Sequence, residues 1–330
     1  MTGSRKGFID DNKIEQAIHY IKDGRDREKP FYLHLVIGLP HPPYQIEEPY
    51  FSMYNREEIT PWPHELPANA PLNMQMMKKY RTEDEISDIA CKEIQAVYYG
   101  MISKVDNMCG RLFKVIEDEE LMENSIIIFW VDHGDFAGQY GLVEKWDTSM
   151  NDCILHVPQI LYAPGLPQGK RISSLTEHVD IAPTILDILD IEQDWGIHGK
   201  SLLPVIDGIF EKDAVYADGG HEDEMHTRFS YDKKIPDDDK NKPLNAKQVT
   251  YRENPDSMAR TSMVRTNEWK MVIRLRGGNE LYNMVKDPYE MNNLWGDSTY
   301  NAVIMELQQK MIEWNLRTYT DRPRQEFVGA

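Results

Sequence analysis

Apolar residues recur at two spacings along this chain, and the spacing separates predicted helices from predicted strands. Steps of three and four residues place side chains on one face of a helix. Four segments show this pattern: residues 12–23, 83–121, 184–189 and 302–316. Asp84 and Glu85 favour the first turn of the second segment, and Pro183 stands at or near the first turn of the third. We therefore predict one long helix, two short ones and an amphipathic helix near the C-terminus.

Continuous apolar runs predict strands at residues 31–37, 126–131 and 157–162. A run rich in β-branched residues is typical of a strand buried on both faces of a parallel sheet. Residues 262–275 instead alternate between apolar and polar positions, and Gly277-Gly278 separates them from residues 280–282, which predicts antiparallel strands. The order of these elements indicates an α/β fold followed by a smaller α+β part.

The composition of the chain changes near residue 208, which predicts two domains, residues 1–208 and residues 209–330. In the first domain, five prolines exclude a long helix from residues 45–82, and we expect an ordered surface excursion near the rim of a pocket. In the second, residues 232–242 are charged and nearly free of apolar residues, which indicates a flexible loop.

Bulk composition excludes several classes of function. The formal net charge of −18 over 330 residues argues against binding to nucleic acid, because phosphates repel an acidic surface. No run approaches the roughly 18 apolar residues of a membrane span. Three cysteines at irregular spacing fit neither a disulfide framework nor a zinc cluster and predict buried free thiols. The first six residues lack the apolar core of a signal peptide.

The candidate catalytic and metal-binding residues follow the ends of predicted strands. Asp132 and His133 directly follow the second apolar run, Lys145 follows in a glycine-rich loop, and His41 lies between prolines after the first run. A carboxylate can hold a divalent cation, a lysine can neutralise an anionic ester, and a histidine can protonate a leaving group. Each residue type also has a purely structural explanation: the aspartate as a turn cap, the lysine as a solvated cation, and the histidine between prolines as part of a rigid loop. Together the four predict metal-assisted hydrolysis of an anionic ester.

Six ordered segments resemble the sulfatase family of the alkaline-phosphatase-like superfamily. They are Val131-Asp132-His133-Gly134-Asp135 through Lys145-Trp146, Pro40-His41-Pro42-Pro43-Tyr44, Val157-Pro158, His178-Val179-Asp180-Ile181-Ala182-Pro183-Thr184, His198-Gly199-Lys200-Ser201-Leu202-Leu203-Pro204, and Leu281-Tyr282 with Asp287-Pro288, Glu290 and Asn292-Asn293-Leu294. The Asp-His pair is more similar to the iduronate-sulfatase and bacterial polysaccharide-sulfatase branch than to the arylsulfatases with Asp-Asn.

The resemblance implies a fold and a set of roles. The fold is an alkaline-phosphatase-like α/β/α sandwich with a smaller C-terminal α+β subdomain. Asp132 becomes a calcium ligand and His133 an adjacent ligand or sulfate contact. Lys145 becomes a sulfate-binding cation, and His41 a sulfate contact or proton donor. Gly219-Gly220-His221 resembles a substrate-side segment of some sulfatases, and His221 is otherwise a turn residue.

The sequence departs from the family in one respect. Neither the Asp-Asp metal pair nor the Cys- or Ser-x-Pro-x-Arg motif, which supplies the formylglycine nucleophile, is present, and the residues after Cys91, Cys109 and Cys153 do not match it. We therefore expect an N-terminally incomplete sulfatase portion that lacks a nucleophile and is inactive alone. We also expect its apolar sheet edge to pair with another copy or with a missing N-terminal fragment.

The leading prediction is a hydrolase of sulfate esters on a sulfated carbohydrate or small molecule. Two alternatives stay open: a non-catalytic module that binds sulfated glycans or a protein partner, and a phosphodiesterase or phosphonate hydrolase of the same superfamily. The family is often periplasmic, secreted or lysosomal, and the sequence leaves the compartment and the sulfated substrate open.

Overall fold

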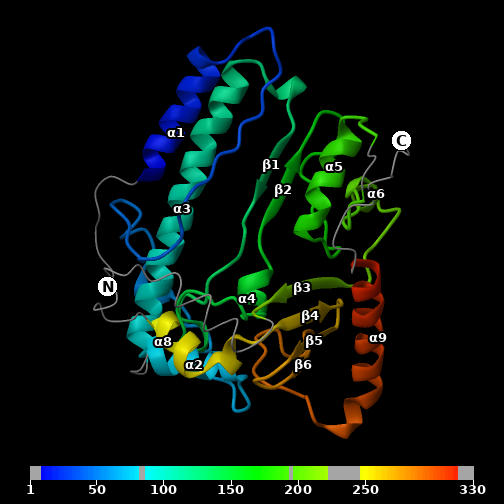
Figure 1. Cartoon of the computed structure of the whole chain (residues 1–330). Helices are drawn as coiled ribbons and strands as arrows, with labels where there is room; N and C mark the ends of the chain where they lie inside the picture. The colour runs from blue at the N-terminus through cyan, green and yellow to red at the C-terminus, as the bar shows by residue number, and fades with distance from the viewer. Residues whose placement is uncertain (1–8, 82–85, 193–195, 222–245, 319–330) are drawn as a thin grey trace. The chain divides into compact units, whose positions relative to one another are not determined.

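The computed structural model describes residues 9–81, 86–192, 196–221 and 246–318. The chain forms two compact units that interleave along the sequence. Unit 1 comprises Met1–Glu65, Arg81–Lys145 and His156–Pro164, and unit 2 comprises Leu66–Tyr80, Trp146–Leu155 and Gly165–Ala330. Figure 1 labels the helices and strands of both units.

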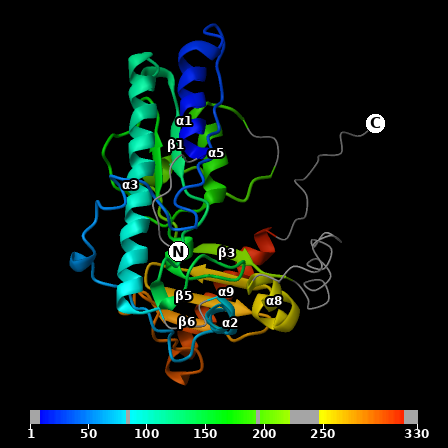
Figure 2. The same cartoon turned by 90° about the vertical axis from the view of Figure 1, so that its left-hand side faces the viewer.

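Two helices form the framework of unit 1. Helix α1 (Ile9–His19) lies beside α3 (Asp88–Asp118), as Figures 1 and 2 both show. The Ser87 hydroxyl caps α3 by accepting a hydrogen bond from the Ala90 amide, which satisfies one of the unpaired donors at a helix start. Their facing apolar side chains, among them Ile14, Val97, Met101 and Met108, form one buried core. The predicted helices at residues 12–23 and 83–121 are therefore confirmed, although α3 begins later than expected.

The opening apolar run forms strand β1 (Ile127–Trp130), which pairs with β2 (Gln159–Tyr162) in a two-stranded ribbon. Both strands were predicted, but two details were wrong. The pairing is antiparallel, with Ile127 opposite Tyr162. The strands are not buried on both faces, because Trp130 is exposed and Ile160 has 62% of its surface accessible.

Residues 31–37 do not form the predicted strand. The segment is extended, but among the described residues it joins no sheet, because no neighbouring strand meets its backbone. Leu35 and Ile37 pack against the core of unit 1, whereas Tyr32 and Val36 are 82% and 61% exposed. The Asp10 carboxylate anchors the end of the segment by accepting hydrogen bonds from the Gly38 and Leu39 amides. The segment therefore presents apolar side chains that a buried strand would hide.

Unit 2 is built on a four-stranded antiparallel sheet in the order β3-β4-β5-β6. These strands are Val215–Gly219, Thr261–Arg265, Trp269–Arg274 and Glu280–Asn283. The last three match the alternating pattern of the sequence, while β3 was not predicted. Residues 232–242, predicted as a flexible loop, lie outside the described residues.

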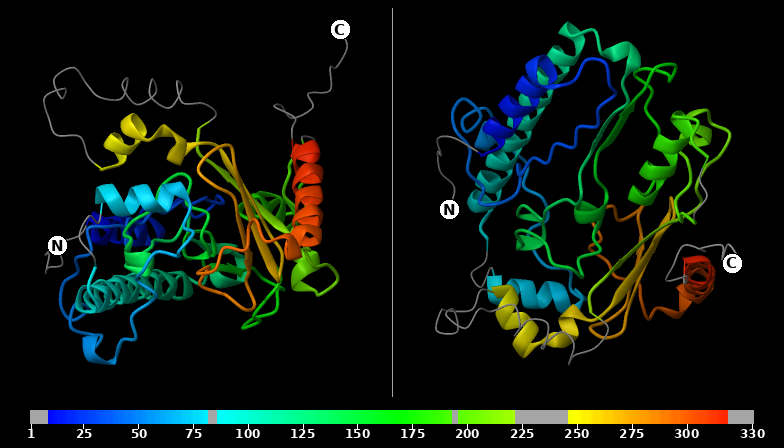
Figure 3. Two further views of the ribbon diagram at one scale, coloured as in Figure 1. Left: turned by 90° about the horizontal axis from the view of Figure 1, so that it is seen from below. Right: turned by 45° about the horizontal axis from the view of Figure 1, so that its top comes forward.

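Opposite faces of this sheet pack against different elements, as the period of two along a strand requires. Val264, Met271 and Leu281 face helix α9 (Asn301–Thr318), which contributes Leu307 and Met311. Figure 3 shows α9 along one side of the sheet. Met263 and Val272 lie on the other face with Met150, close to the short helix α4 (Asp152–Leu155). The predicted C-terminal amphipathic helix is thus confirmed.

The described residues of unit 2 form four further α-helices. They are α2 (Leu72–Arg81, whose last residue falls in unit 1), α5 (Ile181–Ile188), α6 (Leu203–Ile206) and α8 (Ala246–Glu253). Helix α5 confirms the prediction at residues 184–189, while α2 lies in the excursion for which only a long helix was excluded. No helix in the described parts of the chain has the length and apolar character needed to span a membrane. All three cysteines are free thiols, as expected, but only Cys91 is buried, whereas Cys109 and Cys153 are half-buried.

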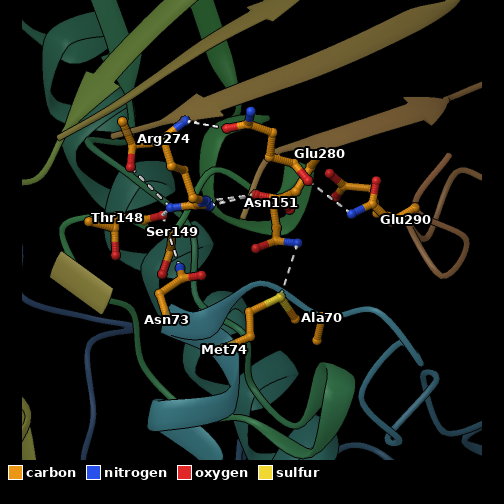
Figure 4. Close-up of polar contacts among 12 residues, drawn as sticks. Ala70, Asn73, Met74, Thr148, Ser149, Asn151, Arg274, Glu280 and Glu290 are labelled. Carbon is orange, nitrogen blue, oxygen red and sulfur yellow. Dashed lines mark hydrogen bonds and ion pairs between the residues drawn. The ribbon is translucent and has the colours of Figure 1, made fainter. Parts of the chain in front are cut away.

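A buried polar network holds the segment before α4 against the sheet. The Arg274 guanidinium donates to the Glu280 carboxylate at 2.7 and 2.9 Å and to the Thr148 carbonyl at 2.9 Å (Figure 4). Asn73 of α2 donates to the same carbonyl at 3.0 Å. Beside it, the Lys270 ammonium lies 2.9 Å from Asp152 and 2.7 Å from Glu290. Because buried charges must be paired, these contacts tie α2, residues 148–152 and the sheet into one body.

Candidate functional site

Asp132 and His133, the two residues predicted to lie at a metal ion, follow β1 in a loop of unit 1. The Asp132 side chain is 82% exposed, and one of its oxygens accepts a hydrogen bond from the His133 amide at 2.9 Å. The other oxygen lies 3.5 Å from His133 Nε2. The two side chains therefore direct an oxygen and a ring nitrogen toward the same point, next to solvent.

The His133 ring is held in one tautomer. Its Nδ1 lies 2.9 Å from the Gly134 carbonyl oxygen, which can only accept a hydrogen bond. Nδ1 therefore carries the proton in the neutral ring, and Nε2 keeps its lone pair. A backbone carbonyl that fixes Nδ1 in this way is the usual support of a histidine that binds a metal through Nε2.

These two donors do not make a complete calcium site. Calcium takes six to eight oxygen ligands, whereas imidazole nitrogen suits zinc and other transition metals better. Within the described ranges, no group of three or more His, Cys, Asp or Glu side chains gathers. Asp132 and His133 fit a part of a divalent-cation site, and the donor set does not specify calcium.

Asp135, the last residue of the Asp-His-Gly-Asp segment, is the half-buried centre of this part of unit 1. Its carboxylate accepts hydrogen bonds from the Tyr44 hydroxyl at 2.5 Å, the Ala137 amide at 2.8 Å and the Glu144 amide at 3.1 Å. Burial raises the pKa of Asp135 above its usual range, although its hydrogen bonds and the charges of Lys145 and His41 act against this shift. The sequence prediction passed over Asp135 because it treated the residue only as part of a motif.

The structure brings two predicted residues into the electrostatic environment of that carboxylate. Lys145 and His41 both interact with Asp135 through their charges, although more than 100 positions separate them in the sequence. The Pro42 carbonyl accepts a hydrogen bond from His41 Nδ1 at 2.8 Å, which leaves Nε2 as the outward nitrogen of the neutral ring. A lysine and a histidine beside one half-buried carboxylate suit the binding of an anion.

Arg81 adds a cation that the sequence prediction missed. Burial lowers the pKa of its guanidinium, while the Tyr44 and Asp135 charges raise it, and an ion pair joins it to Glu144. No local pattern marked it, because Arg81 stands at the end of α2, far from the motif in sequence. Arg81 therefore belongs to the same electrostatic group as Lys145 and His41.

The remaining predicted residue, His221, belongs to unit 2. Its Nε2 lies 3.1 Å from the Tyr251 hydroxyl, and its main chain bonds to Met258 and Arg260. The assignment of His221 as a substrate contact stays a prediction.

The cysteines offer no activated thiol at Cys91 or Cys109. Burial raises the pKa of both, and a thiol with a raised pKa is a poor nucleophile at neutral pH.

Two family models match the chain. One is described as "Sulfatase" and covers residues 3–191. The other is described as "N-sulphoglucosamine sulphohydrolase, C-terminal" and covers residues 230–317. The first spans more than half of the sequence.

Curated relatives agree with these matches. The multifunctional alkaline phosphatase superfamily protein PehA of Trinickia caryophylli is 27% identical over 93% of this chain and 59% of its own length. Human arylsulfatase K is 26% identical over 85% of this chain and 51% of its length. An arylsulfatase of Clostridium perfringens is 25% identical over 93% and 58%. The chain spans between about half and three fifths of these relatives.

Solved structures share the fold. The phosphonate monoester hydrolase of Silicibacter pomeroyi superposes with a TM-score of 0.73 at 20% identity, covering 93% of this chain and 59% of that one. A protein in complex with its substrate D-glucosamine-2-N,6-O-disulfate superposes with a TM-score of 0.69 at 21% identity, covering 98% and 72%. At this identity the likeness establishes the fold alone, which is the alkaline-phosphatase-like α/β arrangement predicted from the sequence.

Proposed function

Because the chain belongs to the sulfatase family, we propose that it forms part of a hydrolase of sulfate esters on a sulfated carbohydrate. The grouping of Lys145, His41 and Arg81 around the half-buried Asp135 supports this proposal, since an acidic chain needs a local cationic site to hold an anionic ester. The match to the sulfatase model over residues 3–191 supports the reaction type.

The residues of this site have separate roles. The Lys145 ammonium binds the sulfate group and stabilises the negative charge that grows on its oxygens. As a nucleophile bonds to sulfur and the bond from sulfur to the ester oxygen breaks, protonated His41 donates its Nε2 proton to that oxygen. The alcohol departs and His41 becomes a neutral imidazole. Asp135 holds both groups electrostatically without contacting the substrate. No residue of this sequence matches the family motif for the nucleophile.

We propose Asp132 and His133 as two ligands of a divalent cation, with calcium as the ion that the family resemblance implies. When bound, such a cation polarises the sulfate oxygens as a Lewis acid. The described residues supply too few donors to hold it alone. The alternative role for His133 is a direct contact to the sulfate group.

The substrate class follows from what the relatives are described to bind. One structural relative holds a disulfated glucosamine, and the C-terminal family model is described by an enzyme that acts on a sulfated amino sugar. We therefore propose a sulfated glycan as the ligand, with His221 as a contact on the substrate side. The interval between the two family matches, residues 192–229, contains the predicted domain boundary at residue 208.

The purified 330-residue chain should not turn over an aryl sulfate, with or without added calcium. The reason is chemical, because no residue matches the formylglycine motif and the described residues supply too few ligands for the cation. The measurement is release of a coloured phenol over many enzyme equivalents. Multiple turnover by the wild-type chain that disappears in Lys145→Met would overturn the predicted inactivity and support the site.

A phosphonate or phosphate-diester hydrolase is the second candidate, since a phosphonate monoester hydrolase superposes with a TM-score of 0.73. Turnover of a phosphate diester without turnover of an aryl sulfate favours it. The third candidate is a non-catalytic module. Calorimetric binding of a sulfated oligosaccharide that Lys145→Met and His41→Ala leave unchanged supports that reading, because the ligand would then bind away from the proposed hydrolase site.

The purified chain should also self-associate or bind a separate polypeptide strand. Tyr32, Val36 and Ile160 of unit 1 are more than 60% exposed, and exposed apolar surface next to unpaired strand edges favours association. Light scattering should give a mass above that of the 38.5 kDa chain. A monodisperse monomer at micromolar concentration contradicts this prediction, and replacing Tyr32 and Ile160 by serine should reduce the measured mass.

A further inference from the structure

A polar chain of four side chains leads to His221 within unit 2. His221 Nε2 lies 3.1 Å from the Tyr251 hydroxyl oxygen. The Tyr251 hydroxyl hydrogen-bonds to one oxygen of Asp147, and the Lys247 ammonium lies 2.6 Å from the other. The order of contacts is therefore Lys247, Asp147, Tyr251 and His221.

The backbone that carries these four side chains is held in place by hydrogen bonds and close packing. The Tyr251 side chain is buried at the end of α8, and the His221 main chain is fixed on both sides, by its amide to Met258 and by its carbonyl to the Arg260 amide. Gly219 ends β3 so close to Asp147 that an added Cβ would lie 2.0 Å from the Asp147 carbonyl oxygen. Only glycine allows this approach, so the backbone holds His221 and Asp147 near each other.

The direction of the hydrogen bonds follows from the chemistry of the groups. Burial raises the pKa of Asp147, but the bonds from Lys247 and Tyr251 outweigh it and hold that pKa below its usual range. Asp147 is therefore a carboxylate at neutral pH and can only accept. The Tyr251 hydroxyl donates to it, and the tyrosine oxygen then accepts the proton of His221 Nε2.

We infer that Asp147, acting through Tyr251, is a positioning residue that fixes His221 as the Nε2–H tautomer. Nδ1 is consequently the nitrogen that gains and loses a proton. The inference rests on the proposed role of His221 at the substrate, and it assigns that role to the Nδ1 side of the ring. A sulfated sugar then meets a ring whose orientation and tautomer are set before binding, which reduces the ordering cost of the contact.

Nitrogen-15 NMR of the histidine rings tests the tautomer in the full chain. In the wild-type chain, the His221 proton should reside on Nε2. In Asp147→Asn, the amide oxygen faces Lys247 and the amide nitrogen faces Tyr251, so Tyr251 donates to His221 and the proton moves to Nδ1. Tyr251→Phe should leave a mixture of tautomers. A wild-type ring protonated on Nδ1, or a tautomer unchanged in both variants, overturns the inference.

Calorimetry with a heparin-derived oligosaccharide tests the consequence. Asp147→Asn and Tyr251→Phe should each weaken binding about tenfold. The control Lys310→Met, which removes a cation of α9 that pairs with Asp213, should leave binding unchanged. Unchanged affinity in both Asp147→Asn and Tyr251→Phe overturns the role assigned to His221. A wild-type chain that binds no sulfated oligosaccharide overturns the proposed function and leaves the tautomer result standing. Unaltered circular dichroism excludes a folding defect in any variant.

Discussion

Replacing Lys270 by methionine should destabilise the protein by about 3–5 kcal/mol, because it removes one partner of a buried ion pair. The Lys270 side chain has no exposed surface, and its ammonium contacts the Glu290 and Asp152 carboxylates. Burial lowers the pKa of Lys270, but the two carboxylates raise it further, so the ammonium stays charged. Methionine has nearly the same length, so the variant creates little empty space. It leaves the Glu290 carboxylate without its cation, while Asp152 keeps only Arg265, at 3.6 Å.

The cost of this substitution should depend on pH. Burial raises the pKa of Glu290 to about 6, above the 4.5 of the free side chain. A carboxyl group whose pKa is raised on folding destabilises the folded state as the pH rises through that pKa. Lys270 lowers the pKa of Glu290 in the wild-type chain, so its removal raises that pKa further. The destabilisation caused by Lys270→Met should therefore be larger at pH 8 than at pH 5, where Glu290 is neutral in both proteins. Urea unfolding at both pH values measures the difference.

Arg276→Met is the matched control. Arg276 pairs with Asp256 at 2.9 Å, but both side chains are at least 40% exposed, and such pairs contribute about 0–1 kcal/mol. A loss of stability in Lys270→Met no larger than in Arg276→Met, at either pH, contradicts the account of the buried pair.

Replacing Gly199 by alanine should cost about 3 kcal/mol, because the new methyl group has no room. An added Cβ at Gly199 would lie 1.8 Å from the Val179 carbonyl oxygen and 2.9 Å from the Asp180 amide nitrogen. Both atoms belong to the backbone, so a rotamer change cannot relieve the clash. The shift would also pull the Lys200 amide from the Asp180 carboxylate, to which it donates at 2.9 Å.

Gly196→Ala controls for the general effect of removing a glycine, since nothing lies within 4 Å of its added Cβ. Thermal unfolding should place the melting temperature of Gly199→Ala well below that of Gly196→Ala. Equal melting temperatures would show that the close approach of Gly199 to the backbone of Val179 and Asp180, just before α5, is not required for stability.

The sequence predicted elements whose side-chain pattern is local. Strands β4 to β6 follow the alternation of residues 262–282, and α9 follows the apolar steps near the C-terminus. Residues 31–37 have the composition of a strand, yet a strand exists only where another backbone pairs with it. That partner is a non-local property, and no feature of Phe31 or Ile37 reveals it.

The site was predictable to a similar degree. Lys145 and His41 were identified from motifs, and both prove to act electrostatically on one carboxylate. Asp135 was visible as the fourth residue of the Asp-His-Gly-Asp segment, but its burial depends on Tyr44, 91 positions away. Lys270 was hidden because a buried lysine in an alternating strand resembles a solvent-facing one. Its partner Glu290 belonged to a recognised motif, which was the one signal that could have located the pair.

The Thr148 carbonyl sets a constraint on how the protein folds during synthesis. It accepts from Asn73, 75 positions earlier, and from Arg274, 126 positions later. The chain passes between the two units at five points of the sequence, so neither unit is complete when its first segment leaves the ribosome. Residues 66–80 must wait until β5 has been translated before their final contacts form. Such long-range closure slows folding and lengthens the time for which the nascent chain needs protection by chaperones.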